Sequence, residues 1–227
     1  MFDALDRPIW TALTTRQSHL ALGGADARRY PPAVSPFAAS RDDGEASLAA
    51  LAALARPGEA MLFLQQSPAV LPPGLVATRT ADAVQMVAAG PFEAVDDPRI
   101  ERLGPGDAAA MLTLAELTKP GPFTLKAQSF GAFFGVKENG RLVAMAGERL
   151  KLPGMTELSG LATHPDFQGR GLGRLLFRHV AGAISARGEA VFLHAYASNE
   201  KAIRLYERLG FTLRSEMSVV FAEIPAA

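Results

Sequence analysis

The sequence predicts a mixed α/β (α+β) protein in which strands and helices alternate through the second half of the chain. Three observations support this fold class. Apolar side chains recur with helical spacing after a glycine-rich stretch at residues 168–173, an Asn-Gly pair at 139–140 joins two strand-like segments, and Gly or Pro closes most segments. Apolar residues form 48% of the 227 residues and charged residues 20%, which is typical of a globular protein.

Residues 1–95 are predicted to be a separate N-terminal α/β lobe. Glycine and proline pairs between residues 22 and 46 predict irregular chain. A helix is expected over residues 45–55, where leucines recur every three positions until Pro57-Gly58 ends the pattern. No motif in this lobe indicates a chemical role. The strands expected in the lobe are residues 61–64, 75–80 and 84–88.

A domain boundary is expected between Pro91 and the acidic stretch at 96–98, so that residues 96–227 form the second predicted domain. Its segments indicate antiparallel hairpins first and a parallel β-α-β unit afterwards. The expected elements, in chain order, are strand 100–103, a helix capped by Gly106-Asp107 and ending near Thr118, strands 131–137, 142–149 and 156–163, a helix from about Leu172 with Gly188 as its C-cap, strand 190–195, helix 199–209 and strand 211–221.

Charge and cysteine content exclude several classes of function. Basic and acidic residues are equal at 23 each, so no overall charge steers the chain toward nucleic acid or an anionic membrane. The chain contains no cysteine, which excludes disulfides, Cys-ligated zinc and an acyl-cysteine intermediate. The histidine spacings indicate no metal site. No apolar run approaches the roughly 18 residues that span a bilayer, and we expect a cytoplasmic protein.

A glycine-rich stretch, Gln168-Gly169-Arg170-Gly171-Leu172-Gly173, lies between an expected strand and an amphipathic helix. Glycines allow a tight turn that presents backbone N–H groups to a ligand, and the start of the helix adds the positive end of its dipole. Together they predict a site for a pyrophosphate, flanked by Arg170 and Arg174. The spacing fits neither a Rossmann fingerprint nor a P-loop. The alternative is a glycine-rich turn that binds no ligand.

A second feature is the helical segment 199–211, where Asn199 and Tyr206 are seven positions apart. At about 100° per residue these two side chains lie on nearly the same helix face. Taken alone, Asn199 could be a simple N-cap and Tyr206 a half-buried packing residue.

In this order, the two features resemble the GCN5-related N-acetyltransferase (GNAT) superfamily, specifically its FR47-like branch. Residues 163–173 are similar to the family's motif A and residues 199–211 to its motif B, while residues 118–123 and 145–149 are similar to the branch. The resemblance covers residues 98–221. It implies a GNAT fold, a twisted mixed β-sheet flanked by helices, with residues 1–95 as an N-terminal extension or a degenerate second lobe.

The resemblance implies an acetyl-CoA-dependent N-acetyltransferase in which an amine attacks the thioester directly in a ternary complex. The acyl group could be acetyl or longer, and the acceptor an amine-bearing small molecule, a protein or a peptide. No metal is expected. The alternative is a non-catalytic acyl-CoA-binding regulatory protein. The N-terminal lobe would shape the acceptor pocket or form a homodimer surface.

The resemblance also implies where the coenzyme binds. Its pantetheine arm would lie between strands 156–163 and 190–195, its pyrophosphate against the glycine-rich turn and its sulfur near Tyr206. The residues expected to bind it are Leu161, Ala162, Thr163, Gln168, Gly169, Arg170, Gly171, Leu172, Gly173, Arg174, Asn199 and Tyr206.

Elementary chemistry supports catalytic roles at this site. An alkyl ammonium with a pKa near ~10.4 must lose a proton before it attacks, and the departing thiolate, whose acid has a pKa of about 8.5, must gain one. Tyr206, a phenol of pKa about 10, is the predicted general acid. By the resemblance, Glu157 and His194 occupy positions of a general base. Ordered water is the remaining alternative.

Overall fold

The structure, a computed structural model, describes residues 4–66 and 68–225, and the chain divides into two compact units. The first comprises Met1–Pro32, Pro36–Met86 and His194–Ala227, and the second Ala33–Ser35 and Val87–Leu193. These units do not coincide with the boundary expected near residue 96, and the division into residues 1–95 and 96–227 stays a prediction. Each unit is described by itself below.

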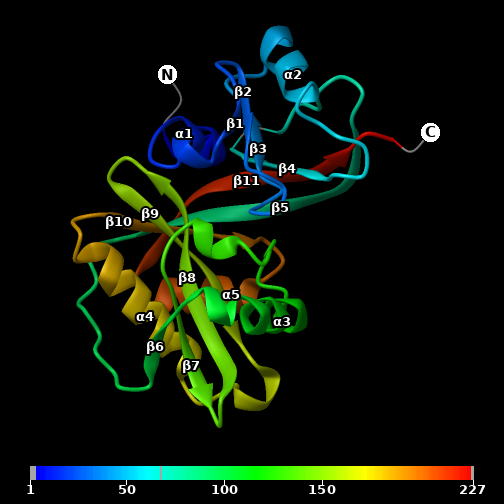
Figure 1. Cartoon of the computed structure of the whole chain (residues 1–227). Coiled ribbons are helices and arrows are strands. Elements are labelled where there is room, and N and C mark those ends of the chain that lie inside the picture. The colour runs from blue at the N-terminus through cyan, green and yellow to red at the C-terminus, as the bar shows by residue number, and fades with distance from the viewer. Residues whose placement is uncertain (1–3, 67, 226–227) are drawn as a thin grey trace. The chain divides into compact units, whose positions relative to one another are not determined.

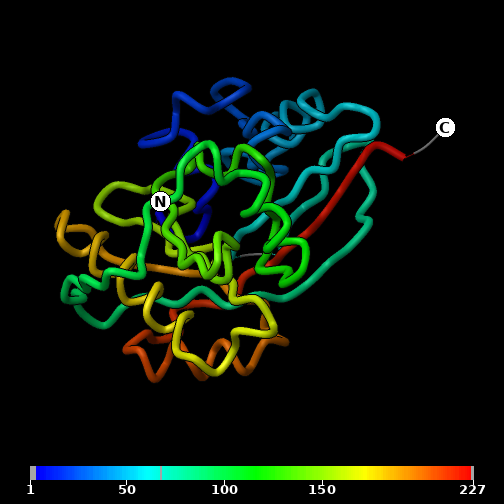
Figure 2. Tube along the Cα trace, turned by 60° about the horizontal axis from the view of Figure 1, so that its bottom comes forward, coloured from blue at the N-terminus to red at the C-terminus, as the bar shows by residue number. Residues whose placement is uncertain are grey.

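The first unit contains the strands β4, β11 and β5, which are hydrogen-bonded neighbours in that order. β11 pairs antiparallel with β4 from Ser218↔Gln65 to Ala222↔Met61. Figure 2 shows β5 and β11 as two long neighbouring segments. The bounds are α1 Pro8–Thr14, β1 Leu22–Gly23, β2 Ala27–Arg29, β3 Ala38–Ser40, α2 Glu45–Ala52, β4 Met61–Gln65, β5 Val76–Ala88, α5 Glu200–Arg208 and β11 Phe211–Glu223.

The core of the first unit forms where α2 and the small antiparallel sheet β1-β2-β3 pack against strands β4 and β11. All five positions of β4 are buried. Leu51 of α2, Met61 and Phe63 of β4, and Val220 of β11 belong to one cluster of buried apolar side chains. Burying such side chains supplies the main free energy that offsets chain ordering.

The second unit contains the strand order β10-β9-β8-β7-β6. Strands β6 to β9 pair antiparallel, whereas β9 and β10 are parallel and are joined by the helix α4. Asn139 and Gly140 form the turn that connects β7 to β8 and have positive φ angles of 52° and 77°, as expected for an Asn-Gly hairpin. The bounds are β6 Ile100–Leu103, α3 Ala108–Thr118, β7 Phe133–Glu138, β8 Arg141–Leu152, β9 Met155–Thr163, α4 Leu172–Ser185 and β10 Ala190–Tyr196.

Helices cover both faces of the sheet in the second unit (Figure 1). Phe133 joins the buried cluster that includes Met111 and Leu114 of α3. The next side chain, Phe134, meets the ring of His179 on α4 with 4.5 Å between ring centroids. Because successive side chains of a strand point to opposite faces, α3 and α4 lie on opposite faces of β7. The result is a mixed sheet flanked by helices, as predicted.

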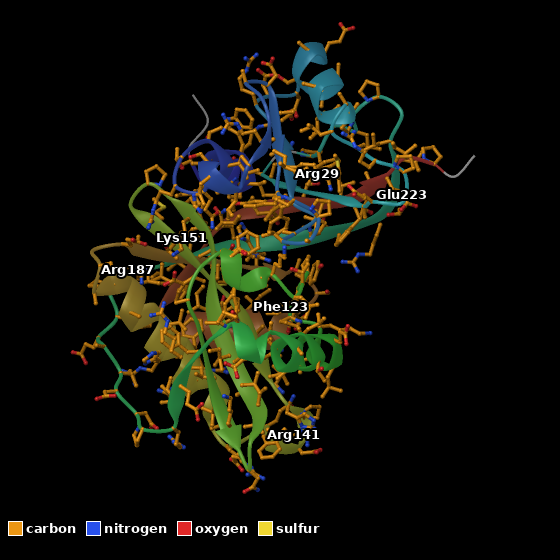
Figure 3. The ribbon with its side chains drawn as sticks, in the orientation of Figure 1. Arg29, Phe123, Arg141, Lys151, Arg187 and Glu223 are labelled. Carbon is orange, nitrogen blue, oxygen red and sulfur yellow. The ribbon has the colours of Figure 1, made fainter. Side chains whose placement is uncertain are left out.

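A buried carboxylate crosslinks this sheet to the end of α4. Glu148, with 1% of its surface exposed, is paired with Lys151 at 2.7 Å and with Arg187 at 2.9 Å. The cationic residues Lys151 and Arg187 are labelled in Figure 3. Two cations around one buried carboxylate compensate for the cost of removing its charge from water.

Several local predictions were wrong. The strands expected at 75–80 and 84–88 are one continuous strand, β5. The segment 22–46 contains three short strands where irregular chain was expected, and the helix α1 was not predicted. The helix expected to reach residue 55 ends at Ala52.

The two expected helix caps have different outcomes. Asp107 is the N-cap residue of α3, as expected, but its side chain makes no capping bond to the helix; its Oδ2 accepts from the backbone N–H of Gly104 at 2.8 Å. Ala186, not Gly188, is the C-cap of α4. Gly188 instead follows in the left-handed region, with φ 74°. None of the helices in residues 4–66 and 68–225 is long and apolar enough to cross a membrane.

Candidate functional site

The glycine-rich turn of the second unit leads from β9 into α4 in a conformation that requires glycine. Gly169 and Gly171 both have φ 78°, a left-handed conformation that costs other residues about 1–2 kcal/mol. Gly171 is the N-cap of α4, and within the described part of the chain no side chain caps this helix. Gln168 to Gly171 and Arg174 are exposed. The first N–H groups of α4 therefore face outward without an intrahelical partner.

The turn packs against the C-terminal end of β9. A Cβ on Gly173 would lie 3.2 Å from Thr163 Oγ1, so glycine permits the close approach of helix and strand. Gln168 Nε2 donates to the Thr163 carbonyl at 3.5 Å. Thus the structure brings the predicted pyrophosphate turn and the predicted pantetheine strand together within one unit.

Positive charge accompanies this turn. The Arg170 guanidinium stacks over the Phe167 ring at 4.6 Å and lies 3.5 Å from Glu138. Arg174 is exposed and, among the described residues, has no ion-pair partner. No acidic residue occupies the first turn of α4. The helix dipole and these two cations favour an anion at this place.

Strand β9 carries an irregularity at the residues expected to face pantetheine. The register with β8 shifts between Ser159↔Gly147 and Ala162↔Met145, and Gly160 has φ 64°. Such a bulge redirects backbone groups of the bulged strand, here Gly160 and Leu161. The described pairs between β9 and β10 run from Ala190↔Met155 to Phe192↔Glu157, so Leu161, Ala162 and Thr163 lie beyond the last of them.

In the first unit, helix α5 carries Asn199 and Tyr206. Asn199 is the N-cap, and its Oδ1 accepts from the backbone N–H of Ala202 at 3.2 Å. Its side-chain oxygen therefore stabilises the helix start. Tyr206 is half-buried against Phe211, with 6.5 Å between ring centroids. Burial raises the pKa of Tyr206 above its ordinary value of 10.0, so the phenol keeps its proton at neutral pH.

Glu157 is fully buried in the second unit and is held by Arg149. Arg149 donates through Nε at 2.8 Å and through Nη2 at 2.6 Å, one bond to each carboxylate oxygen. The backbone N–H of Leu150 also donates to Glu157 Oε2, at 3.2 Å. This forked pairing stabilises the ionised carboxylate.

His194 lies in the first unit, in the second half of β10. Its Nε2 lies 2.9 Å from Gln85 Nε2 on β5. Gln85 is fully buried and also contacts Arg214, whose Nη1 donates to Gln85 Oε1 at 3.0 Å. Arg214 in turn donates to Asp6 Oδ1 at 2.6 Å. His194 is therefore the end of a polar chain that passes through the buried Gln85.

Sequence reasoning missed two residues of these contacts, Arg149 and Gln85. Arg149 lies on the strand next to Glu157 in a hairpin, and a basic residue facing an acidic one there is a signal that could have been found. Gln85 precedes His194 by 109 positions. No local pattern links two residues so far apart. No cluster of three metal-ligating side chains occurs in the described residues.

A small cleft in the second unit lies beside β9. It is lined by the loop Pro120–Phe123, by Phe130 and Phe133, and by Arg149, Ser159 and Gly160. Phe123 is labelled in Figure 3, and its ring packs edge-on against Phe133 at 5.6 Å. The lining is aromatic with one guanidinium at its border.

Comparison with known proteins agrees with this architecture. The family model described as FR47-like protein matches residues 133–220. The solved structure of a putative acetyltransferase of the GNAT family from Novosphingobium aromaticivorans DSM 12444 is 41% identical, has a TM-score of 0.92 and aligns over 99% of this chain and 100% of that one.

Curated relatives match a shorter region. Ribosomal protein bS18-alanine N-acetyltransferase of Escherichia coli (strain K12) is 42% identical over 79 residues, 34% of this chain and 53% of that protein. Mycothiol acetyltransferase of Mycobacterium avium (strain 104) is 36% identical over 98 residues, 39% of this chain and 31% of that protein. The match thus spans about half of the first relative's length and a third of the second's.

The chain combines a mixed sheet, a parallel β9-α4-β10 unit and a glycine turn that leaves the start of α4 without a side-chain cap among the described residues. With the full-length likeness to the Novosphingobium protein, this shows the family. The chain belongs to the GNAT family.

Proposed function

We propose that the protein is an acetyl-CoA-dependent N-acetyltransferase that moves an acyl group from coenzyme A to an amine. The observation that carries this proposal is the exposed turn 168–174, whose helix start is left uncapped within the described residues. Bare N–H groups at the positive end of a helix dipole suit the pyrophosphate of the coenzyme. The acetyltransferase names of the relatives support the same chemistry.

The coenzyme would be held by two kinds of contact. Gln168, Gly169, Arg170, Gly171, Leu172, Gly173 and Arg174 would bind the pyrophosphate. Backbone groups of Leu161, Ala162 and Thr163 would pair with the pantetheine amides, since these residues lie beyond the last β9–β10 pair. The amide nitrogen of Asn199 stays available for pantetheine, because the helix cap uses only its oxygen.

Tyr206 is the proposed general acid for the departing thiolate. Its raised pKa keeps the phenol protonated, which a proton donor requires. The same shift makes transfer to a thiol of ordinary pKa about 8.5 more uphill than the ~2 kcal/mol expected from unshifted values. That cost is still small beside the 8–23 kcal/mol or so by which enzymes lower barriers.

Glu157 and His194 are the proposed catalytic residues on the amine side. Glu157 is already paired with Arg149, and His194 Nε2 already faces Gln85. We therefore propose that ordered water takes the proton and that each of these side chains supports the reaction without removing the proton itself. Accordingly, single Glu157→Gln and His194→Ala variants should lower the rate but keep the acidic limb of the pH–rate profile. Loss of that limb in one variant would identify that residue as a direct base.

The acceptor is proposed to be an amine on a peptide, a protein or a small molecule. A peptide with an N-terminal alanine is a rational first substrate, because one relative is named as an alanine N-acetyltransferase of a ribosomal protein. The cleft beside Phe123 and Arg149 is the proposed place for the group attached to the amine. A cytoplasmic location and a homodimer stay predictions.

The experiment combines calorimetry with a thiol-release assay. Coenzyme A should bind, and acetyl-CoA should release free thiol steadily in the presence of an amine panel. Sequential kinetics are expected because the chain has no cysteine to carry an acyl group. Binding without turnover on any amine would favour a non-catalytic acyl-CoA-binding protein. No binding heat at all would refute the proposal.

A further inference from the structure

A partly buried polar chain in the first unit runs from Asp6 through Arg214 and Gln85 to His194. Arg214 donates to Asp6 Oδ1 at 2.6 Å and to Gln85 Oε1 at 3.0 Å. Gln85 Nε2 lies 2.9 Å from the Leu5 carbonyl and 2.9 Å from His194 Nε2. Gln85 is 0% exposed, so water cannot replace these bonds.

The orientation of the Gln85 amide follows from its neighbours. A guanidinium can only donate and a backbone carbonyl can only accept. With its oxygen toward Arg214 and its nitrogen toward Leu5, the amide satisfies both. The reversed amide would place NH₂ against the guanidinium and oxygen against the carbonyl, which is unfavourable at both ends in a buried setting.

This orientation determines which nitrogen of His194 carries the proton. Gln85 Nε2 carries two hydrogens and has two neighbours at 2.9 Å, so one N–H serves the Leu5 carbonyl and the other is left for His194 Nε2. A proton on Nε2 would put two donors 2.9 Å apart. Nε2 must therefore accept, and in a neutral imidazole the proton then lies on Nδ1.

We infer that Gln85 is a positioning residue that fixes His194 as the Nδ1–H tautomer, with Arg214 and Asp6 holding Gln85 in place. His194 is then a hydrogen-bond donor through Nδ1, and its proton-accepting nitrogen is taken by Gln85. This inference deepens the proposed function, on which its catalytic meaning rests: His194 takes part as a hydrogen-bond donor and does not itself remove the amine's proton.

Nitrogen NMR of the full-length protein with ¹⁵N-labelled histidine tests the tautomer directly. The chain has four histidines, and the spectrum of a His194→Asn variant assigns the His194 signals by difference. Long-range proton–nitrogen correlations distinguish the protonated from the unprotonated ring nitrogen. We expect Nδ1 of His194 to be protonated at neutral pH. Protonation on Nε2 alone, or equal populations of both tautomers, would overturn the inference.

Two substitutions of Gln85 test its role. In Gln85→Glu the side chain can only accept, so the His194 proton should move to Nε2. In Gln85→Met the amide is removed without a large loss of volume, and a mixture of tautomers is expected. An unchanged spectrum in both variants would show that Gln85 does not set the tautomer. Gln65→Glu is the matched control, because Gln65 is also a buried glutamine that donates to a backbone carbonyl, that of Pro68.

Kinetics connect the tautomer to the reaction. Gln85→Met should lower kcat about tenfold, with KM for acetyl-CoA changed by less than about twofold, because positioning of a hydrogen bond acts on the chemical step. A wild-type kcat would refute the catalytic meaning. The two proposals fail separately: absence of coenzyme binding in calorimetry removes the proposed function, whereas the nitrogen spectrum alone decides the tautomer.

Discussion

Substituting Gly171 by alanine tests the proposed coenzyme contact at the start of α4. Gly171 has φ 78° and is the N-cap of the helix, and a Cβ at this position meets no atom within 4 Å. The cost of Gly171→Ala is therefore conformational, about 1–2 kcal/mol for a left-handed backbone carrying a side chain. Crowding adds nothing to it.

This strain should appear in coenzyme affinity as well as in stability. In the variant, the turn relaxes toward negative φ and withdraws the N–H groups from their outward direction. Binding must then restore the original conformation. The binding free energy of coenzyme A should therefore weaken by the same 1–2 kcal/mol or so, which raises the dissociation constant about 5- to 30-fold. Calorimetry with coenzyme A measures this change, and pantetheine, which lacks the pyrophosphate, should show none.

Gly188→Ala is the matched control at the other end of the same helix. Gly188 has φ 74° and equally open surroundings, so its substitution should cost similar stability without affecting the coenzyme. Equal weakening of coenzyme binding by both substitutions would show that the effect is general destabilisation. A destabilised Gly171→Ala protein with unchanged affinity would refute the proposed role of the turn.

Three further predictions concern stability and proton transfer. Tyr206→Phe should lower kcat. The folded protein raises the pKa of the Tyr206 phenol, so the wild-type protein should lose stability as the pH rises above about 10, the pKa of the unfolded phenol, toward the folded value. The phenylalanine variant has no phenol to ionise and should lack this loss, which denaturation at several pH values would detect. Glu157→Leu should cost about 3–5 kcal/mol in urea unfolding by stranding Arg149, and the double variant with Arg149→Leu should recover part of this; additive losses would contradict the pairing. Gly182→Ala should cost about 1–3 kcal/mol because its Cβ would lie 2.5 Å from the Glu93 backbone oxygen, and an unchanged melting temperature would contradict that packing.

The elements of the second unit were predictable because each has a local signal. Asn139-Gly140 marks the β7–β8 hairpin, and both residues adopt the positive φ angles that this pair favours. The glycine turn and the apolar periodicity after it locate the start of α4 at Leu172. Such signals depend on neighbours in sequence, so they can be read without tertiary structure.

The first unit was harder to predict because its strands depend on distant partners. In β5, residues 76–80 are exposed whereas Val84 to Met86 are buried, so its pattern changes within one strand and suggested two. β2 and β3 are three residues each and pair with one another across a proline-rich loop. Their pairing, more than their own composition, defines them as strands.

The candidate site divides in the same way. The turn at 168–173 was predicted from contiguous residues, and the N-cap role of Asn199 was the alternative to its predicted contact with the coenzyme. The partners of Glu157 and His194 were not predicted, because Arg149 and Gln85 reach them only through strand pairing and packing. Side chains that can react are easier to predict from a sequence than the neighbours that hold them in place.

The start of α4, which has no side-chain cap among the described residues, has a consequence for the stability of the protein in a cell. In the proposed enzyme the diphosphate completes a helix that the chain itself leaves open, so the coenzyme is also a folding partner. Stability then grows with coenzyme supply, by about 2.7 kcal/mol at a hundredfold excess over the dissociation constant. Cells with a high coenzyme concentration would then accumulate more of the enzyme than cells with a low one, because the bound protein is degraded more slowly.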